Sequence, residues 1–269
     1  MRWTNGGRLR DNDRMADPSL DSTRRFSSRV ADYVKYRPGY PQRVVELCRD
    51  AMGLTRESVV ADIGSGTGIA TELFLTNGNT VYGVEPNPDM RRAAEQLLAH
   101  RYAGFHSRDG TAEATNLPDD AVDLVIAAQA FHWFDKAAAA REFRRVLRPG
   151  GHVVIVWNDR KTDGSPLLAG YDALLRTLGT DYKQVSKTTT SVEDLHDVFN
   201  VPFRRVSFPN GQRFDFEGFK GRAMSASYSP MSGHPAHEPF IAGLRNLFDA
   251  HQRDGQVVFE YETEVFFGA

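Results

Sequence analysis

Three glycines that directly follow a short apolar segment are the residues best placed to do chemistry. Val59–Ile63 is typical of a buried strand, and Gly64-Ser65-Gly66-Thr67-Gly68 follows it at once. Glycine lets the backbone turn sharply and lets a ligand approach the main chain closely. A dinucleotide loop would carry its third glycine at position 69, which is Ile69, and no Gly-Lys-Ser/Thr of a phosphate loop follows. The segment therefore predicts a ligand-binding turn of neither common type.

An acidic residue, Glu85, ends the next predicted strand, Thr80–Val84, and lies 21 residues after Gly64. A carboxylate at this place can accept hydrogen bonds from both hydroxyls of a ribose. The alternative is that Glu85 only caps the helix that begins at Pro88. We favour the first interpretation because the strand, the glycine turn and the acid occur together. The ligand is therefore expected to contain a nucleoside.

A third candidate group follows the apolar strand Val122–Ala128. His132 is the best candidate for a general base, because its unperturbed pKa near 6.5 suits proton uptake. The alternative is that His132 only orients its loop by hydrogen bonding, and the sequence favours neither interpretation over the other. Trp133 and Phe134 are expected either to wall a substrate pocket or to lie near a positively charged group, which an aromatic face attracts. For Phe134 the alternative is packing under the helix that follows. The pair His234 and His237 lacks helical metal-ligand spacing, and no metal site is expected.

An aromatic and basic cluster precedes the glycine turn. Tyr33, Tyr36 and Arg37 stand ahead of a proline turn and are expected on an N-terminal lid. The planar fork of an arginine suits a carboxylate, so Arg37 is assigned to a carboxylate of the cofactor or of an acidic substrate. A surface arginine with no ligand is the alternative.

The elements that must position these groups alternate along the chain. Strands are predicted at 59–63, 80–84, 103–107, 122–128 and 152–157, with helices at 69–76, 88–100 and 135–147 between them. This order predicts a doubly wound α/β fold with a mostly parallel sheet. Ligands of such sheets bind beyond the carboxyl ends of the strands. The turn, Glu85 and His132 all lie at that edge.

The composition excludes several classes of protein. The chain has 269 residues, 33 Lys and Arg against 35 Asp and Glu, and a net charge of −2. A dedicated nucleic-acid binder is usually basic, so no nucleic-acid partner is expected. Cys48 is the one cysteine, which excludes a disulfide scaffold, and no run approaches the ~20 apolar residues of a membrane helix. The expected location is the cytoplasm, with no membrane partner, as a monomer or homodimer.

The motifs taken together resemble the class I S-adenosylmethionine-dependent methyltransferases. The resemblance covers roughly residues 58–157 and includes Asp62-Ile63-Gly64-Ser65-Gly66-Thr67-Gly68, Glu85, Gly110-Thr111-Ala112-Glu113, and Arg145-Val146-Leu147-Arg148-Pro149-Gly150-Gly151. Tyr33–Pro41 and Gln129–Asp135 resemble the small-molecule methyltransferase type 11 group, which includes trans-aconitate methyltransferase-like proteins. Ser225–Tyr228 and Tyr261–Thr263 also look like that group. The implied fold is a seven-stranded, mostly parallel Rossmann-like sheet with an antiparallel edge strand and a cap region.

The resemblance implies a role for each matching residue. The cofactor-binding residues would be Asp62, Gly64, Ser65, Gly66, Gly68, Glu85, Pro86, Met90, Thr111, Ala112, Gln129 and Ala130. Asp62 would help to hold the methionine ammonium group, Glu85 the ribose, and Met90 and Ala112 the adenine. Such enzymes often carry Asp where Thr111 stands, but a threonine hydroxyl can still accept a hydrogen bond. Tyr33, Tyr36, Arg37, Trp133 and Tyr228 would contact the substrate or form the lid.

The expected layout has a flexible tail at 1–22 and a methyltransferase domain at 23–269. Its parts are a helical lid at 23–52, the cofactor core at 58–157, a cap at 158–255 and a terminal strand at 256–269. The expected activity is methyl transfer from S-adenosylmethionine to O, N or C of a small molecule, which releases S-adenosylhomocysteine. The alternatives are a cofactor-binding protein of this fold without turnover and an RNA methyltransferase.

Overall fold

The computed structural model describes residues 34–180, 182, 195, 196, 198, 199 and 203–268. The predicted tail at 1–22 and the first part of the lid, including Tyr33, lie outside the described residues. The described helices are α3 (Arg43–Met52), α4 (Ile69–Asn77), α5 (Pro88–Leu98), η3 (Phe131–Trp133), α6 (Lys136–Val146), α7 (Pro166–Leu178), α10 (Phe216–Met224) and α11 (His237–His251). The strands are β1 (Val59–Ile63), β2 (Thr80–Val84), β3 (Phe105–Arg108), β4 (Val122–Ala128), β5 (Leu147–Arg160), β6 (Arg204–Phe214) and β7 (Val257–Gly268).

Seven strands form one sheet in the order β3-β2-β1-β4-β5-β7-β6, which confirms the predicted fold class. The first five of these strands pair in parallel. β7 pairs antiparallel with both β5 and β6, so the antiparallel strand lies one position in from the edge, and β6 forms the edge itself. Between β1 and β4 the order of the strands reverses, and ligands of doubly wound sheets bind at such a point.

Both faces of the sheet are covered. On β1 and β4, alternate side chains enter two different hydrophobic clusters. Ala61 and Val125 pack with α6, whereas Val60 and Leu124 pack with α3, α4 and α5. This alternation is the reason that β4 is apolar almost throughout, as expected of a strand buried on both sides.

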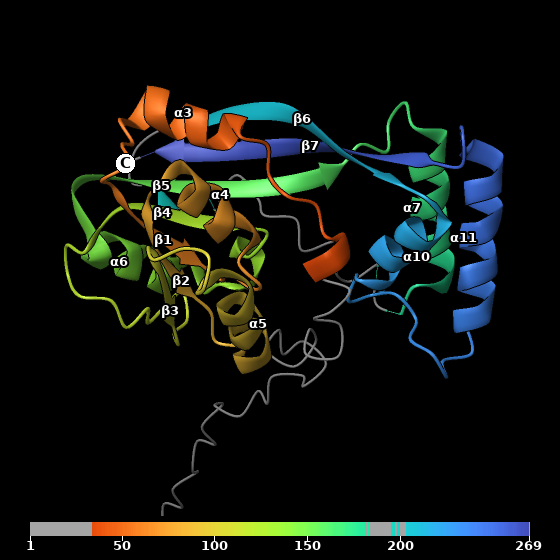
Figure 1. The fold of residues 1–269 in the computed structure, drawn as a ribbon, viewed down its shortest axis with the longest axis horizontal. Coiled ribbons are helices and arrows are strands. Elements are labelled where there is room, and N and C mark those ends of the chain that lie inside the picture. The colour runs from red at the N-terminus through yellow and green to blue at the C-terminus, as the bar shows by residue number, and fades with distance from the viewer. Residues whose placement is uncertain (1–33, 181, 183–194, 197, 200–202, 269) are drawn as a thin grey trace, which may run out of the picture.

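A second hydrophobic core lies beyond the sheet. The long strands β5, β6 and β7 extend past the parallel strands, and α7, α10 and α11 pack around their far ends (Figure 1). The core of this helical lobe contains Tyr171, Phe219, Phe240, Phe259 and Tyr261, all nearly inaccessible to solvent. Helices α7, α10 and α11 lie between residues 158 and 255, the region predicted as a cap, whereas Phe259 and Tyr261 belong to β7.

The segment before α3 is fixed between the sheet and the helical lobe. The Gln212 side-chain amide donates to the Tyr36 carbonyl at 3.2 Å, and the Asn210 amide donates to the Gly39 carbonyl at 2.8 Å. A Cβ atom at Gly221 of α10 would overlap the Tyr36 ring, so the absence of a side chain there lets the ring approach the helix. These contacts set the place of Arg37.

Candidate functional site

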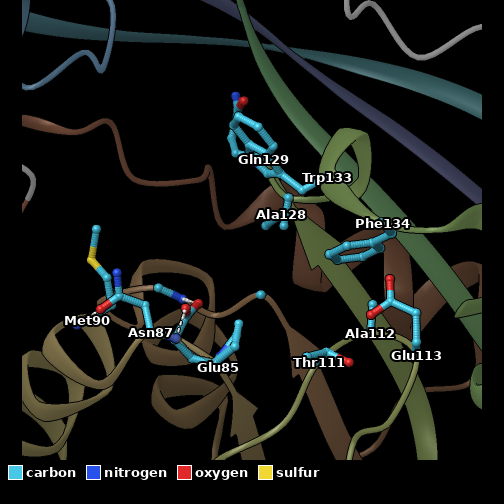
Figure 2. Close-up of a pocket in the computed structure, with 14 residues that line it drawn as sticks. Glu85, Asn87, Met90, Thr111, Ala112, Glu113, Ala128, Gln129, Trp133 and Phe134 are labelled. Atoms are coloured by element: carbon cyan, nitrogen blue, oxygen red, sulfur yellow. Dashed lines mark hydrogen bonds between the residues drawn. The ribbon is translucent and has the colours of Figure 1, made fainter. Parts of the chain in front are cut away.

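A cavity of about 220 Å³ opens at the carboxyl ends of β1, β2 and β4. We call it the Glu85 cavity, and Figure 2 shows its lining. Its residues are Gly64, Gly66, Glu85, Pro86, Asn87, Met90, Thr111, Ala112, Glu113, Ala128, Gln129, Ala130, Trp133 and Phe134. The structure thus brings together nine of the twelve predicted cofactor-binding residues, together with Trp133.

The glycine turn leaves room where side chains would otherwise stand. Gly64 has φ 69° and Gly66 has φ 57°, both in the left-handed region that favours glycine. A Cβ atom at Gly64 would lie 2.6 Å from the Ala130 Cβ atom, which prevents any side chain. At Gly66 a Cβ atom would have nothing within 4 Å, because it would extend into open space. The backbone of Gly66 is therefore accessible to a ligand.

Glu85 is 8% exposed as a residue, and its carboxylate is fixed at the wall of this cavity. Its Oε2 accepts from the Gly66 amide at 2.9 Å and its Oε1 from the Asn87 amide at 2.8 Å. Burial raises the pKa of Glu85, and the two amide hydrogen bonds oppose that rise. Each carboxylate oxygen keeps acceptor capacity for a ligand donor.

The cap of α5 is Asn87 and not Glu85. The Asn87 side chain accepts from the amides of Asp89 and Met90 at the start of the helix. The capping alternative for Glu85 is therefore wrong. Sequence reasoning missed Asn87 as a cavity residue, although its place two positions after Glu85 was a usable signal.

Three predicted cofactor residues, Asp62, Ser65 and Gly68, are absent from the lining of the Glu85 cavity. Asp62 is 1% exposed and accepts from the Thr71 hydroxyl at 2.6 Å, while its Oδ1 has no partner among the described residues. Burial, opposed by the Thr71 hydrogen bond and assisted by the charge of Glu85, raises the pKa of Asp62 to about 7. The Ser65 hydroxyl lies beside Gly83 of β2. At Gly68, a Cβ atom would lie 2.5 Å from Leu98, so this glycine serves the packing of α4 on α5.

The opposite wall combines a loop after β3 with aromatic rings after β4. The Thr111 hydroxyl accepts from the Ala114 amide at 3.2 Å and lines the cavity. Glu113 and Phe134 also line it. Glu113 belongs to the loop whose sequence resembles the family's, and no individual role was predicted for it. The Phe134 ring packs edge-on against Phe131, which anchors it in the sheet's core. In Figure 2, Gln129 and Trp133 lie on the far side of the cavity from Met90 and Glu85.

A second, polar cavity of about 200 Å³ adjoins the first at Gln129, which lines both. We call it the Arg222 cavity, and its lining is Arg37, Pro38, Tyr40, Ile69, Gln129, Asn158, Asp159, Arg160, Arg222 and Tyr228. Two predicted substrate residues, Arg37 and Tyr228, meet here from opposite ends of the chain. Gln129 has φ 57° and donates from its side chain to the Asn158 carbonyl at 3.1 Å.

Two other candidates lie outside both cavities. His132 lines neither of them, and burial together with the positive charge of Lys136 lowers its pKa to about 4. An imidazole of this pKa is a weak base at neutral pH, so the structure supplies no contact that supports the predicted role. The Tyr36 ring packs on α10 at Gly221 and lines neither of these two cavities, so its contribution is to hold the segment that carries Arg37.

The described part of the chain holds no group of three or more His, Cys, Asp or Glu side chains that could bind a metal ion. In the same residues, no helix has the length and apolarity needed to cross a membrane.

The sequence of the core matches a known family. Residues 61–155 match the family model described as a methyltransferase domain. An uncharacterised methyltransferase of Mycobacterium tuberculosis is 39% identical over 140 residues, which are 52% of this chain and 54% of that protein. An uncharacterised methyltransferase of Schizosaccharomyces pombe is 29% identical over 204 residues, 66% of this chain and 78% of that protein. The chain spans about half the length of the first curated relatives it matches.

Solved structures share the fold. The structure of a candidate type II methyltransferase from Anaeromyxobacter dehalogenans superposes on this chain with a TM-score of 0.62. The two sequences are 22% identical, and the superposition covers 87% of this chain and 97% of that chain. Phosphoethanolamine N-methyltransferase 2 of Haemonchus contortus superposes with a TM-score of 0.55 at 15% identity. That superposition covers 93% of this chain and 58% of the other. The fold is that of the class I methyltransferases. The residues that line the Glu85 cavity all lie within residues 61–155, the part of the chain that matches the methyltransferase-domain model.

Proposed function

We propose that this protein is an S-adenosylmethionine-dependent methyltransferase that methylates O, N or C of a small molecule and releases S-adenosylhomocysteine. One observation carries the proposal. The Glu85 carboxylate and the Gly64–Gly66 turn face the same cavity, at the point where the strand order reverses. That arrangement provides a ribose acceptor beside an accessible main chain. The matched domain at 61–155 supports the same function.

The residues of the Glu85 cavity fit S-adenosylmethionine. Glu85 would bind the ribose hydroxyls, and Met90, Thr111 and Ala112 would hold the adenine. The turn at Gly64 and Gly66 would hold the methionine part. The Oδ1 atom of Asp62, buried behind that turn without a described partner, suits an ammonium group nearby. The bound cofactor would supply a methyl group already activated by its sulfonium, and no metal is expected.

The protein's contribution would be positioning. Methyl transfer is an in-line displacement, so the chain must align the nucleophile with the methyl group and exclude water. Trp133 and Phe134 would wall the reaction site, and Gln129 would separate the cofactor from the acceptor. A base at His132 stays a prediction. We expect its replacement by alanine to spare cofactor binding and lower turnover, and normal turnover of His132→Ala would remove the assignment.

The proposal also includes the protein's family group, location and oligomeric state. We propose a type 11 enzyme of the trans-aconitate methyltransferase-like group that is located in the cytoplasm and acts as a monomer or homodimer. The net charge of −2 speaks against the alternative RNA substrate, since phosphate contacts dominate RNA affinity. A binding protein without turnover is the remaining alternative, and methyl transfer to any acceptor distinguishes it from an enzyme.

The decisive experiment is calorimetric titration of the full chain with S-adenosylmethionine, S-adenosylhomocysteine, NAD and NADP. We expect micromolar binding of the two adenosyl ligands and no binding of the nicotinamide cofactors. The solved Haemonchus contortus protein was captured with S-adenosylhomocysteine, which makes that compound a suitable probe. Binding of NAD alone, or of none of the four, would overturn the proposed function.

A further inference from the structure

The Arg222 cavity carries an excess of positive charge. Three guanidinium groups line it, from Arg37, Arg160 and Arg222, against one carboxyl group, that of Asp159. Burial, assisted by the charge of Glu264 and opposed by Arg160 and Arg205, raises the pKa of Asp159 and so disfavours its negative form. The Asp159 carboxylate therefore compensates at most one of the three cations within the cavity.

Arg222 is the most deeply placed of these cations. It is 4% exposed, and its Nε donates to the Tyr261 hydroxyl at 2.7 Å. Among the described residues it forms no ion pair with a carboxylate, and its Nη1 has no hydrogen-bond partner. The rings of Phe259 and Tyr261, with centroids 5.1 and 5.6 Å from the guanidinium carbon, offset part of the cost of burying this charge. A buried charge without a counter-ion is still costly, and the unsatisfied donor adds to that cost. An anion in this cavity would offset that cost.

Tyr228 lies in the field of the same positive charges. Its hydroxyl accepts from Arg160 Nη1 at 3.1 Å. Although burial opposes the change, the charges of Arg160, Arg222 and Arg37 lower the pKa of Tyr228. The three arginines thus act together on one point at the cavity wall.

The arginines are held in place by the scaffold. Arg160 ends β5 and lies 3.7 Å from Asp172 of α7, while Arg37 donates from Nη2 to the Ser225 carbonyl at 3.1 Å. Their guanidinium groups are therefore pre-organised, which reduces the ordering cost of binding. Arginine forks match the paired oxygens of a carboxylate or phosphate.

We propose that the Arg222 cavity binds an anionic oxygen group, carboxylate or phosphate, and that this group anchors the methyl acceptor while a different atom of the acceptor is methylated. Guanidinium donors occupy oxygen lone pairs and withdraw charge, so an anchored oxyanion is a poor nucleophile. The nucleophilic atom would then lie toward Gln129, where this cavity meets the Glu85 cavity. Anion binding stands without the proposed function, whereas the anchoring role rests on it.

The first test measures anion binding to the full chain. Thermal unfolding and calorimetry would be run with succinate, with inorganic phosphate, and with neutral dimethyl succinate as control. Binding of succinate alone would identify a carboxylate anchor, and binding of phosphate alone a phosphate anchor. Dimethyl succinate should not bind. Failure of both anions to bind would overturn the inference even if S-adenosylhomocysteine binds.

The second test places the anion by substitution. Arg222→Met should weaken anion binding at least about tenfold, the cost of losing hydrogen bonds to a charged group, and should keep S-adenosylhomocysteine affinity. Its unfolding temperature without anion should equal or exceed that of the wild type, because a charge without a counter-ion is removed. Arg245→Met is the matched control, since Arg245 lies on α11 and outside both cavities.

Two outcomes would contradict this placement. Equal anion affinity of Arg222→Met and wild type would put the anion elsewhere. If Arg222→Met fails to fold, Arg37→Met provides the same comparison, and unchanged anion affinity in that variant would overturn the site.

The third test addresses the anchoring role. The protein would be incubated with butyrate, whose one carboxylate must be the anchored group, and S-adenosylmethionine labelled in its methyl group, followed by alkali. We expect no labelled methanol, because an anchored carboxylate is not methylated. Labelled methanol from the wild type that disappears in Arg222→Met would show that the bound carboxylate is itself the acceptor and would overturn the anchor assignment. Loss of S-adenosylhomocysteine binding would instead contradict the proposed function.

Discussion

The two adjoining cavities are built in opposite ways. The Glu85 cavity is formed by residues between positions 64 and 134, largely by main chain, apolar side chains and one buried carboxylate. The Arg222 cavity collects side chains from positions 37 to 228, and its character is cationic. The first depends on turns at strand ends, whereas the second depends on how the helical lobe packs beside the sheet.

The difference indicates which parts of the chain shape each cavity. A change of local backbone in the glycine turn should affect the Glu85 cavity and leave the Arg222 cavity intact. A change in α10 or in the segment before α3 should do the reverse. Because Gln129 lines both cavities, a substitution of this residue should affect both of them.

The largest expected effect concerns the buried acid beneath the first cavity. The folded-state pKa of Asp62, about 7, lies above its ordinary value of 3.8. The folded state therefore binds this proton more tightly than the unfolded state. The stabilisation is fully present below pH 3.8 and is lost as the pH rises to about 7. The free energy of unfolding should fall by roughly 4 kcal/mol across this window.

Urea denaturation at several pH values checks this expectation. Asp62→Asn should flatten most of the fall, and the raised pKa of Glu85 should leave a smaller slope of the same sign. Asp109→Asn, at an exposed position, is the control. If the wild type becomes more stable between pH 4 and pH 7, and Asp62→Asn abolishes that rise, the raised pKa of Asp62 would be contradicted.

The second prediction separates two glycines of the same turn. Gly64→Ala should lower the free energy of unfolding by about 3 kcal/mol, because left-handed strain is added to the clash with Ala130. Gly66→Ala should cost about 1 kcal/mol, the strain alone. Both should weaken S-adenosylhomocysteine binding, measured by calorimetry. Equal destabilisation by the two substitutions would mean that the space at Gly66 is not open.

The third prediction concerns Glu85. Replacement by alanine should weaken S-adenosylhomocysteine binding about 100-fold, since hydrogen bonds to a charged group are worth about 1.5–3 kcal/mol. Glu113→Ala is the matched control, because Glu113 lines the same cavity but accepts from the Asp135 amide at 2.9 Å. We expect calorimetry to show little change for it. Similar losses in both variants would deny Glu85 a specific role.

The smallest expected effect lies in the Arg222 cavity. Tyr228→Phe removes the hydroxyl that accepts from Arg160 and should change succinate or phosphate affinity by about tenfold or less, near 1 kcal/mol. S-adenosylhomocysteine affinity should stay the same. A loss of adenosyl binding in Tyr228→Phe would show that the two cavities are energetically coupled and would weaken the comparison.

Much of the fold could be predicted because its signals are local. The ranges of β1, β2 and β4 match the predicted strands, and α6 lies within the predicted helix 135–147. By contrast, β5 runs to Arg160 rather than ending at 157, because its antiparallel pairing with β7 continues that far. Helix α10 was not predicted, since its sequence, Phe216–Met224, has little amphipathic pattern and its stability comes from packing in the helical lobe.

The candidate site divides along the same line. Sequence alone determined the glycine turn and its acidic partner, because glycine conformation and the spacing of strand ends follow from neighbouring residues. Only the tertiary structure decided that Arg37, Arg160, Arg222 and Tyr228 share one cavity, and that His132 lies outside it. Contacts over more than 180 positions, such as Arg37 with Ser225, leave no local pattern in the chain. They are fixed by the packing of α10 against the sheet, which brings these distant residues together.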